Sequence, residues 1–300
     1  MIPPVPIRKP TPVDYALLVA AAVMWASAFT AIKIAVPETG PVWLAAIRVT
    51  FGFIALLPYA LWRGLAWPAS RGQWGLIVGM ACLNMVVPFF LVAWAGETLP
   101  AGVLSLLMGT GPFLALVGSH FLTQDDRLTR RKLIAVVLGF AGIMVVVGPS
   151  AAAGIGQGDF HAKAAALAAS LCYVTAGLLI RRIHMPPVRL ACLALGVGAT
   201  LLLPLALVFE GLPPVGISSH AWAALVFLGV FPTGLAYILR FHLIRSIGMT
   251  RFSLSINMVP VFGVMLGAII LSEPLSLSVL MALALVLAGL VVASRDKKAL

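Results

Sequence analysis

Seven polar or aromatic residues lie inside stretches of the chain that are otherwise apolar. They are Trp25, Asn84, Thr110, Tyr173, Thr233, Tyr237 and Asn257. Amide and hydroxyl groups can bind the charged ends of a small zwitterion, whereas rings can cover its apolar part or hold an ammonium group. Each residue alone is more often an interhelical hydrogen bond or a packing residue. Together they predict the lining of a cavity for a small amphiphilic molecule.

Arg48 is a cation inside another apolar segment, and two roles are open for it. It could bind a substrate carboxylate, or it could be a structural residue that snorkels or caps backbone carbonyls and so ties helices together. The structural role is the favoured one. Lys33 lies nearer to the end of its segment and is expected to snorkel.

Pro112 in the sequence GTGP and Pro260 in the sequence NMVP interrupt two further apolar segments. Proline has no backbone N–H, so it leaves a carbonyl of the preceding turn without its donor. Non-helical backbone inside a membrane is tolerated where it lines a cavity or is buried. The pair predicts either hinges beside a substrate pathway or static kinks that help packing.

Titratable side chains avoid the middles of the apolar segments. The nine acidic residues, among them Glu38, Glu210 and Glu273, and the five histidines lie in loops or near segment ends. The three cysteines match no metal-binding spacing, and no GxGxxG or Walker-type sequence is present. We therefore expect no metal, no cofactor and no catalytic residue, and neither ATP binding nor a proton relay through side chains.

The composition indicates the fold class of the elements that position these residues. Hydrophobic residues make up 62% of the chain, charged residues make up 10%, and the mean hydropathy is +1.10. A soluble core of this size could not bury so much apolar surface, and a spanning helix needs about 20 apolar residues. Gly75/Gly79 and Gly263/Gly267 are expected to let helices approach closely. We predict an all-α integral membrane protein with ten transmembrane helices, at 13–36, 41–63, 73–95, 100–122, 131–148, 161–181, 187–209, 221–243, 250–271 and 276–294.

The basic residues predict the orientation of these helices. If the N-terminus is cytoplasmic, 17 of the 20 basic residues fall on the cytoplasmic side, and only Lys33, Arg48 and Lys163 fall on the outer half. This bias follows the positive-inside rule and predicts that both termini are cytoplasmic. The basic pI of about 10.3 is then a topology signal rather than a nucleic-acid surface.

The chain is predicted to consist of two similar halves offset by about 148 residues. SLLMGTGP (Ser105–Pro112) matches SLSINMVP (Ser253–Pro260), and Trp25 and Tyr173 fall at equivalent positions. Five helices in each half place the second half upside down in the membrane, as in the inverted repeats of secondary transporters. The expected divisions are an N-terminal tail at 1–12, a first repeat at 13–150, a linker at 151–160, a second repeat at 161–294 and a C-terminal tail at 295–300.

The sequence resembles the EamA branch of the drug/metabolite transporter superfamily over nearly its whole length. The resemblance rests on MWASAFTAIKIA (Met24–Ala35), Arg48, the paired Pro112 and Pro260, and LSEPLS (Leu271–Ser276). Within this branch the overall sequence pattern is most similar to that of the YddG-type exporters of aromatic and other amino acids. The resemblance implies a protein of the bacterial inner membrane that exports amino acids. Unlike many relatives, the chain has no acidic or polar residue directly before either proline, which argues against carboxylate-based coupling.

Together these patterns predict a secondary transporter that exports amino acids, aromatic and other neutral ones in particular, by alternating access. Its partners would be the small-molecule substrate and the lipid bilayer, without nucleic acid, and a monomer is expected. An exporter of cationic drugs or other small metabolites is the alternative within the superfamily. A channel or an intramembrane enzyme is the alternative of another class, although the histidines are too scattered for catalysis.

Overall fold

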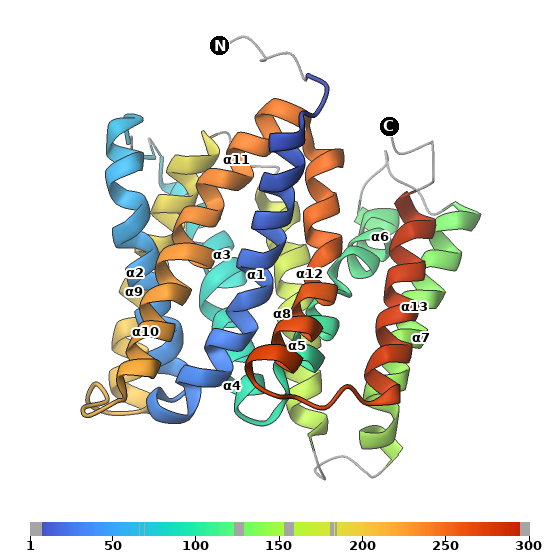
Figure 1. Ribbon diagram of the computed structural model, residues 1–300. Helices are drawn as coiled ribbons and strands as arrows, with labels where there is room; N and C mark the ends of the chain where they lie inside the picture. Colours follow the sequence, from blue (N-terminus) through green and yellow to red (C-terminus); the bar gives the residue numbers. More distant parts are fainter. Residues whose placement is uncertain are drawn as a thin grey trace.

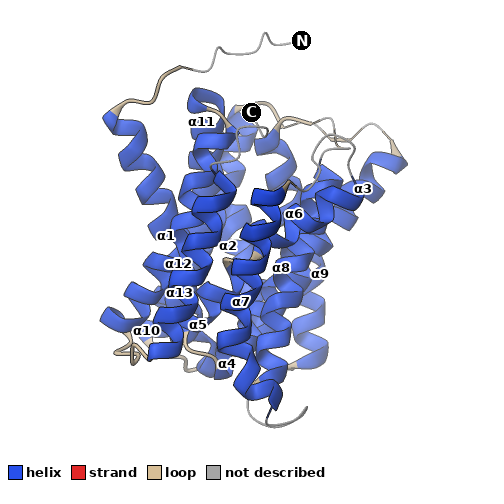
Figure 2. Ribbon diagram, turned by 90° about the vertical axis from the view of Figure 1, so that its right-hand side faces the viewer, coloured by secondary structure: helices blue, strands red, loops and turns tan. Residues whose placement is uncertain are grey.

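Helices joined by short loops form the whole described part of the chain (Figure 1). The computed structural model describes residues 8–65, 67–68, 70–122, 129–152, 159–180, 183 and 185–294, and within them there is no β-strand (Figure 2). The expected tails and linker lie largely outside these residues. The elements are α1 (Pro12–Thr39), α2 (Pro41–Trp62), α3 (Arg71–Ala81), η1 (Cys82–Val86), α4 (Val87–Thr98), α5 (Ala101–Met108), α6 (Gly111–Leu122), α7 (Arg130–Ala152), α8 (Phe160–Ile180), α9 (Pro187–Phe209), α10 (Ser219–Leu228), η2 (Gly229–Leu235), α11 (Ala236–Ile247), α12 (Met249–Ile270) and α13 (Leu277–Ser294).

Several of these helices are long and apolar enough to cross a membrane. Among the described residues, six helical stretches meet this requirement: Pro12–Thr39, Pro41–Trp62, Arg71–Thr98, Arg130–Gly148, Pro187–Phe209 and Ser219–Ile244. Three shorter apolar stretches accompany them: Ala101–Val117, Ser255–Ile270 and Leu277–Ala293. In hydrocarbon a helix satisfies its backbone hydrogen bonds internally. The described helices therefore make a multi-pass membrane protein.

The two ends of the bundle differ in what they carry. Helix α1 begins and helix α13 ends at the same end, uppermost in Figure 1, which we call the terminal end. The opposite end, which we call the loop end, carries Gly40 and the loops 99–100, 210–218 and 271–276. This arrangement fits an even number of membrane crossings.

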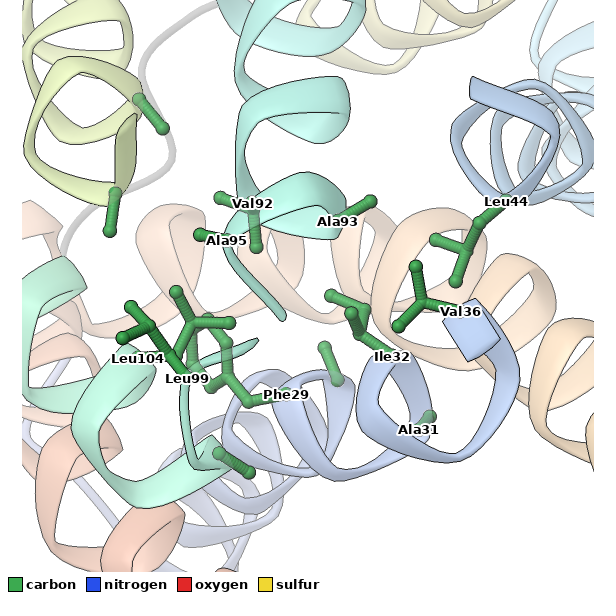
Figure 3. Packing of buried hydrophobic residues seen from close by; sticks show 14 of the residues in the cluster. Phe29, Ala31, Ile32, Val36, Leu44, Val92, Ala93, Ala95, Leu99 and Leu104 are labelled. Carbon is green, nitrogen blue, oxygen red and sulfur yellow. The ribbon is translucent and has the colours of Figure 1, made fainter. Parts of the chain in front are cut away.

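The buried core near the loop end brings together helices from distant parts of the chain. Phe29, Ile32 and Val36 of α1 pack with Leu44 of α2 and with residues of α4 and α5 (Figure 3). A second core cluster joins α2, α3, α4 and α9. These clusters hold α2 and α4 in place, and both helices contribute to the site described below.

The segment 100–122, expected as one helix, is interrupted where its proline predicts. Helix α5 ends at Met108, and α6 begins at Gly111 after the turn at Gly109–Thr110. Pro112 has no N–H to donate to Met108 four residues earlier, so the α-helical ladder cannot continue through this point. Pro260, at the equivalent position, lies inside the continuous helix α12. The two prolines therefore act differently on their helices.

Helices α5 and α12 cross at close range through small residues. A Cβ atom added to Gly109 would collide with the ring of Pro260, and one added to Gly263 would collide with the side chain of Ser105. Small residues permit such approach in membranes, where packing replaces the hydrophobic effect as the driving force. Gly263 thus behaves as expected. By contrast, nothing lies within 4 Å of a Cβ added to Gly75 or Gly79, so the structure does not show the expected close approach there.

The crossing predicts that one added methyl group destabilises the protein at Gly109 but not at Gly75. Gly109→Ala inserts a methyl where the Pro260 ring packs, and such overpacking costs about 1–3 kcal/mol. We expect a lower melting temperature of the detergent-purified protein. Gly75→Ala adds the same methyl in open space and is the matched control. Equal melting temperatures for the two variants would contradict the described crossing.

Candidate functional site

Arg48 lies in the interior of the bundle, on α2. Its side chain is only 7% exposed. Its Nε donates a hydrogen bond to Thr233 Oγ1 at 2.7 Å, and its guanidinium carbon lies 3.8 Å from the centroid of the Phe89 ring. The guanidinium is thus held from two sides, by a hydroxyl of η2 and by an aromatic face of α4, an arrangement that favours cation–π attraction.

The π-helix η2 places Thr233 against Arg48. Pro232 cannot donate to the Leu228 carbonyl four residues earlier, and Thr233 Oγ1 donates to that carbonyl instead, at 2.8 Å. The same oxygen accepts from Arg48 Nε, so the Thr233 hydroxyl is both a donor and an acceptor. A Cβ added to Gly52 of α2 would lie 2.7 Å from Thr233 Cγ2, which shows how closely the two elements pack. π-Helical turns frequently mark functional sites.

The second π-helix, η1, contributes Asn84 to the same region. Val87 N–H donates to the Cys82 carbonyl five residues earlier, which is the hydrogen bond that defines a π turn. Asn84 Nδ2 donates to the hydroxyl of Tyr237 at 3.0 Å and so connects η1 to α11. The Tyr173 ring packs against Phe89, with ring centroids 6.5 Å apart. Both tyrosines pack against the core cluster that contains Phe89.

The structure therefore brings four of the seven predicted lining residues together around Arg48. We call this group the central cluster; it consists of Arg48, Asn84, Phe89, Tyr173, Thr233 and Tyr237. Sequence reasoning missed Phe89, one of 15 phenylalanines in the chain. Its only sequence signal is its place one residue after Pro88, in the turn that follows η1.

The other three predicted residues lie elsewhere. Trp25 packs edge-on against Phe252 with ring centroids 5.7 Å apart, in a separate cluster of α1, α11 and α12. Thr110 donates to the Leu107 carbonyl at 2.6 Å and faces a small apolar pocket bordered by α7 and α13. Asn257 is half-buried on α12. Within the described residues, no side-chain hydrogen bond or ring contact joins these three residues to the central cluster.

No metal site is apparent in the part of the chain that the structure describes. It contains no group of three or more His, Cys, Asp or Glu residues placed to hold an ion. The central cluster offers one guanidinium, an amide, hydroxyls and three rings, which are groups that can bind the polar and apolar parts of a small molecule.

Three carboxylates join distant segments at the loop end. Glu210 accepts hydrogen bonds from Val42 N and Trp43 N, at 2.9 and 2.8 Å, at the start of α2. Glu273 accepts from Ala101 N and Gly102 N, at 2.6 and 2.9 Å, at the start of α5. The first N–H groups of a helix have no partner inside the helix, and the helix dipole favours a negative charge there.

The third carboxylate, Glu38, lies in the first half of the chain and binds a residue of the second half, whereas Glu210 and Glu273 lie in the second half and bind the first. It accepts from Ser218 N and Ser218 Oγ at 2.6 and 2.7 Å, just before α10. We call Glu38, Glu210 and Glu273 the loop-end clasps. Sequence reasoning placed all three near segment ends but did not predict their partners, because each partner is more than 160 residues away in the chain.

The clasps predict a loss of stability when an acceptor is removed. Glu273→Ala leaves the Ala101 and Gly102 N–H groups without their carboxylate, and loss of a helix cap costs about 1 kcal/mol. We expect a lower melting temperature in detergent, with Glu273→Gln intermediate because one acceptor oxygen remains. Glu97→Ala, which removes an exposed carboxylate with no hydrogen bond in the described part of the chain, is the control. An unchanged melting temperature for Glu273→Ala would refute the capping role.

Known proteins similar to this chain include transporters of bacteria and archaea. An uncharacterized transporter of Archaeoglobus fulgidus is 27% identical over 282 residues, covering 91% of this chain and 95% of the relative. A probable terminal-alkyne amino-acid exporter of Streptantibioticus cattleyicolor is 27% identical over 270 residues, covering 85% and 84%. A crystal structure with 23% sequence identity has a TM-score of 0.68 and covers 95% of this chain and 98% of the other, so the two share a fold.

The family model described as the EamA-like transporter family matches the chain twice. The matches span residues 14–148 and residues 162–295. They include every residue of the central cluster, with three members in each match. The two matches together cover most of the chain, and the chain therefore belongs to the EamA-like transporter family.

Proposed function

We propose that this protein is a secondary transporter that exports amino acids, aromatic and other neutral ones in particular, across the bacterial inner membrane. The observation that carries the proposal is the central cluster. Arg48, Asn84 and Phe89 come from the first family match, whereas Tyr173, Thr233 and Tyr237 come from the second. A ligand held between the halves contacts both of them, so movement of one half against the other can expose it to either side of the membrane.

The chemistry of the cluster suits an amino acid. A guanidinium and an amide can engage charged groups, while three rings offer an apolar wall. The relative named as a probable terminal-alkyne amino-acid exporter supports the same substrate class. The YddG-like assignment within the family stays a prediction.

We propose that ten helices cross the membrane as two inverted five-helix repeats, at 13–150 and 161–294. The double family match supports this division. The π-helices support it as well, since η2 follows η1 by about 148 residues, the offset at which the two halves match. Both termini are then cytoplasmic, as the basic residues predict, and the loop end faces outward.

This orientation gives the loop-end clasps a role in alternating access. Glu210 and Glu273 belong to the second repeat and cap helices of the first, while Glu38 belongs to the first and binds Ser218 of the second. In the described conformation these hydrogen bonds tie the repeats together at the outward end. Release of substrate to the outside requires that such bonds break and re-form with water.

The direct test is counterflow in proteoliposomes with a panel of labelled amino acids and no pH gradient. We expect saturable uptake of labelled amino acid into vesicles preloaded with the same unlabelled compound, because a carrier exchanges substrate without an energy source. Protein-free liposomes are the control. Absence of counterflow for every amino acid would refute the substrate class, and transport that requires an imposed pH gradient would refute the facilitated mechanism.

The two prolines predict a separate effect on transport. Pro112→Ala permits α5 and α6 to join into one helix, and Pro260→Ala removes the ring that packs against Gly109. We expect each change to lower the initial rate of counterflow severalfold while leaving the amount of inserted protein unchanged. Pro204→Ala replaces an exposed proline inside α9 and is the matched control. Normal rates in both variants would rule out hinge function at this crossing.

A further inference from the structure

Arg48 uses only one side of its guanidinium for contacts with the protein. An arginine carries five side-chain N–H donors, and within the described residues the only side-chain hydrogen bond of Arg48 runs from Nε to Thr233. The terminal nitrogens Nη1 and Nη2, which we call the guanidinium fork, have no hydrogen-bond partner among these residues. No described carboxylate lies within 4.0 Å of them. The fork is therefore an unpaired cation inside the bundle.

Lys33 and Lys163, the two other cations predicted for the outer half of the membrane, both have a structural role as carbonyl caps. Lys33 Nζ donates to the carbonyls of Gly96 and Glu97, at 3.1 and 3.2 Å. Lys163 Nζ donates to the Val146 carbonyl and lies 2.9 Å from a carboxylate oxygen of Asp159. Both lysines cap backbone carbonyls, which is the role that the sequence favoured for Arg48. The fork of Arg48 caps none.

An unpaired charge in this setting is costly, and its persistence indicates a ligand. Burying an unpaired cation in a membrane protein costs several kcal/mol, and intramembrane charges mark substrate pathways. Arg48 is seven residues into α2, so about 10 Å of helix separate it from the loop end. Lys and Arg side chains near helix ends can reach water by snorkelling. Arg48 points instead to Thr233 and Phe89, in the interior.

The contacts of Arg48 also leave the fork edge of the guanidinium uncovered. In the described residues, the only fully enclosed side-chain nitrogen or oxygen atoms without a hydrogen-bond partner are Thr30 Oγ1 and Arg240 Nε, so the fork of Arg48 is not completely enclosed by the protein. Thr233 fixes the Nε edge and Phe89 covers one face. The remaining edge has the planar geometry that binds both oxygens of a carboxylate.

We propose that the guanidinium fork of Arg48 is the carboxylate-binding site of the transporter, with Thr233 as its positioning residue. This inference rests on the proposed function and restricts its substrates to compounds with a free carboxylate. Zwitterionic amino acids meet the requirement, and the Asn84–Tyr237 pair and the rings of the central cluster then face the rest of the molecule. Organic cations without a carboxylate are repelled by the unpaired charge, which disfavours the cationic-drug alternative.

The test compares acids with their amides in the reconstituted full-length protein. L-phenylalanine and L-leucine are paired with L-phenylalaninamide and L-leucinamide, which keep the side chain and the amine but lack the carboxylate. We expect each amide to compete with labelled parent amino acid at least about tenfold more weakly, because a charge-assisted hydrogen bond contributes about 1.5–3 kcal/mol. This comparison uses the unaltered protein and needs no variant.

Variants then assign the discrimination to Arg48. Arg48→Gln should raise the KM for the amino acid and bring acid and amide to similar affinity, with Arg48→Lys retaining part of the preference. Thr233→Val, which removes the oxygen that holds Nε, should weaken the preference for the acid while the fork remains. Lys33→Gln removes another cation without touching the central cluster and should leave the preference unchanged. Insertion and monodispersity of each variant are checked before assay.

The outcomes separate this inference from the proposed function. Counterflow of amino acids with equal competition by acid and amide overturns the carboxylate site while the export function stands. An Arg48→Gln protein that folds and keeps the full preference for the acid does the same. If the unaltered protein exchanges no amino acid at all, the proposed function fails, and the assignment of Arg48 fails with it.

Discussion

The hydrogen bond from Arg48 to Thr233 is the interaction on which the centre of this protein depends. It joins α2 in the first half of the chain to η2 in the second, and it holds the guanidinium in the interior of the bundle. The local backbone is built around it: Pro232 frees the Leu228 carbonyl, Thr233 binds that carbonyl, and Gly52 lets η2 approach α2. A charge fixed in this way leaves its fork unsatisfied by protein.

The loop end is organised differently, because the carboxylates of its three clasps accept hydrogen bonds from the protein. Glu210 and Glu273 each accept two N–H hydrogen bonds at the start of a helix of the other half. Water at the membrane surface offers equivalent donors, so exchanging such bonds with water costs far less than breaking them in an apolar medium. In the proposed mechanism the halves separate at this end, and the ligand completes the charge at the centre.

Much of the fold and part of the site could be predicted from the sequence. Apolar segments placed most helices to within a few residues, and Pro112 indicated the break between α5 and α6. A polar or aromatic residue inside an apolar segment indicated both Tyr173, which lies in the central cluster, and Thr110, which does not. The sequence pattern cannot separate the two, because packing decides which way each face of a helix points. The clasp partners could not be foreseen, since they are set by contacts across the whole chain. The sequence favours a structural role for Arg48, and its hydrogen bond to Thr233 does tie α2 to η2. That its terminal nitrogens find no carbonyl could not be foreseen, because the groups around a buried cation are set by tertiary packing.

The central claim is tested most directly by an experimental structure of the protein in lipid nanodiscs with L-phenylalanine or L-leucine. We predict both carboxylate oxygens within about 2.7–2.9 Å of Nη1 and Nη2 of Arg48, the distance of a charge-assisted pair. The side chain of the ligand should contact Phe89, Tyr173 or Tyr237. An amino acid bound elsewhere, with the fork of Arg48 capped by backbone carbonyls, would contradict the account.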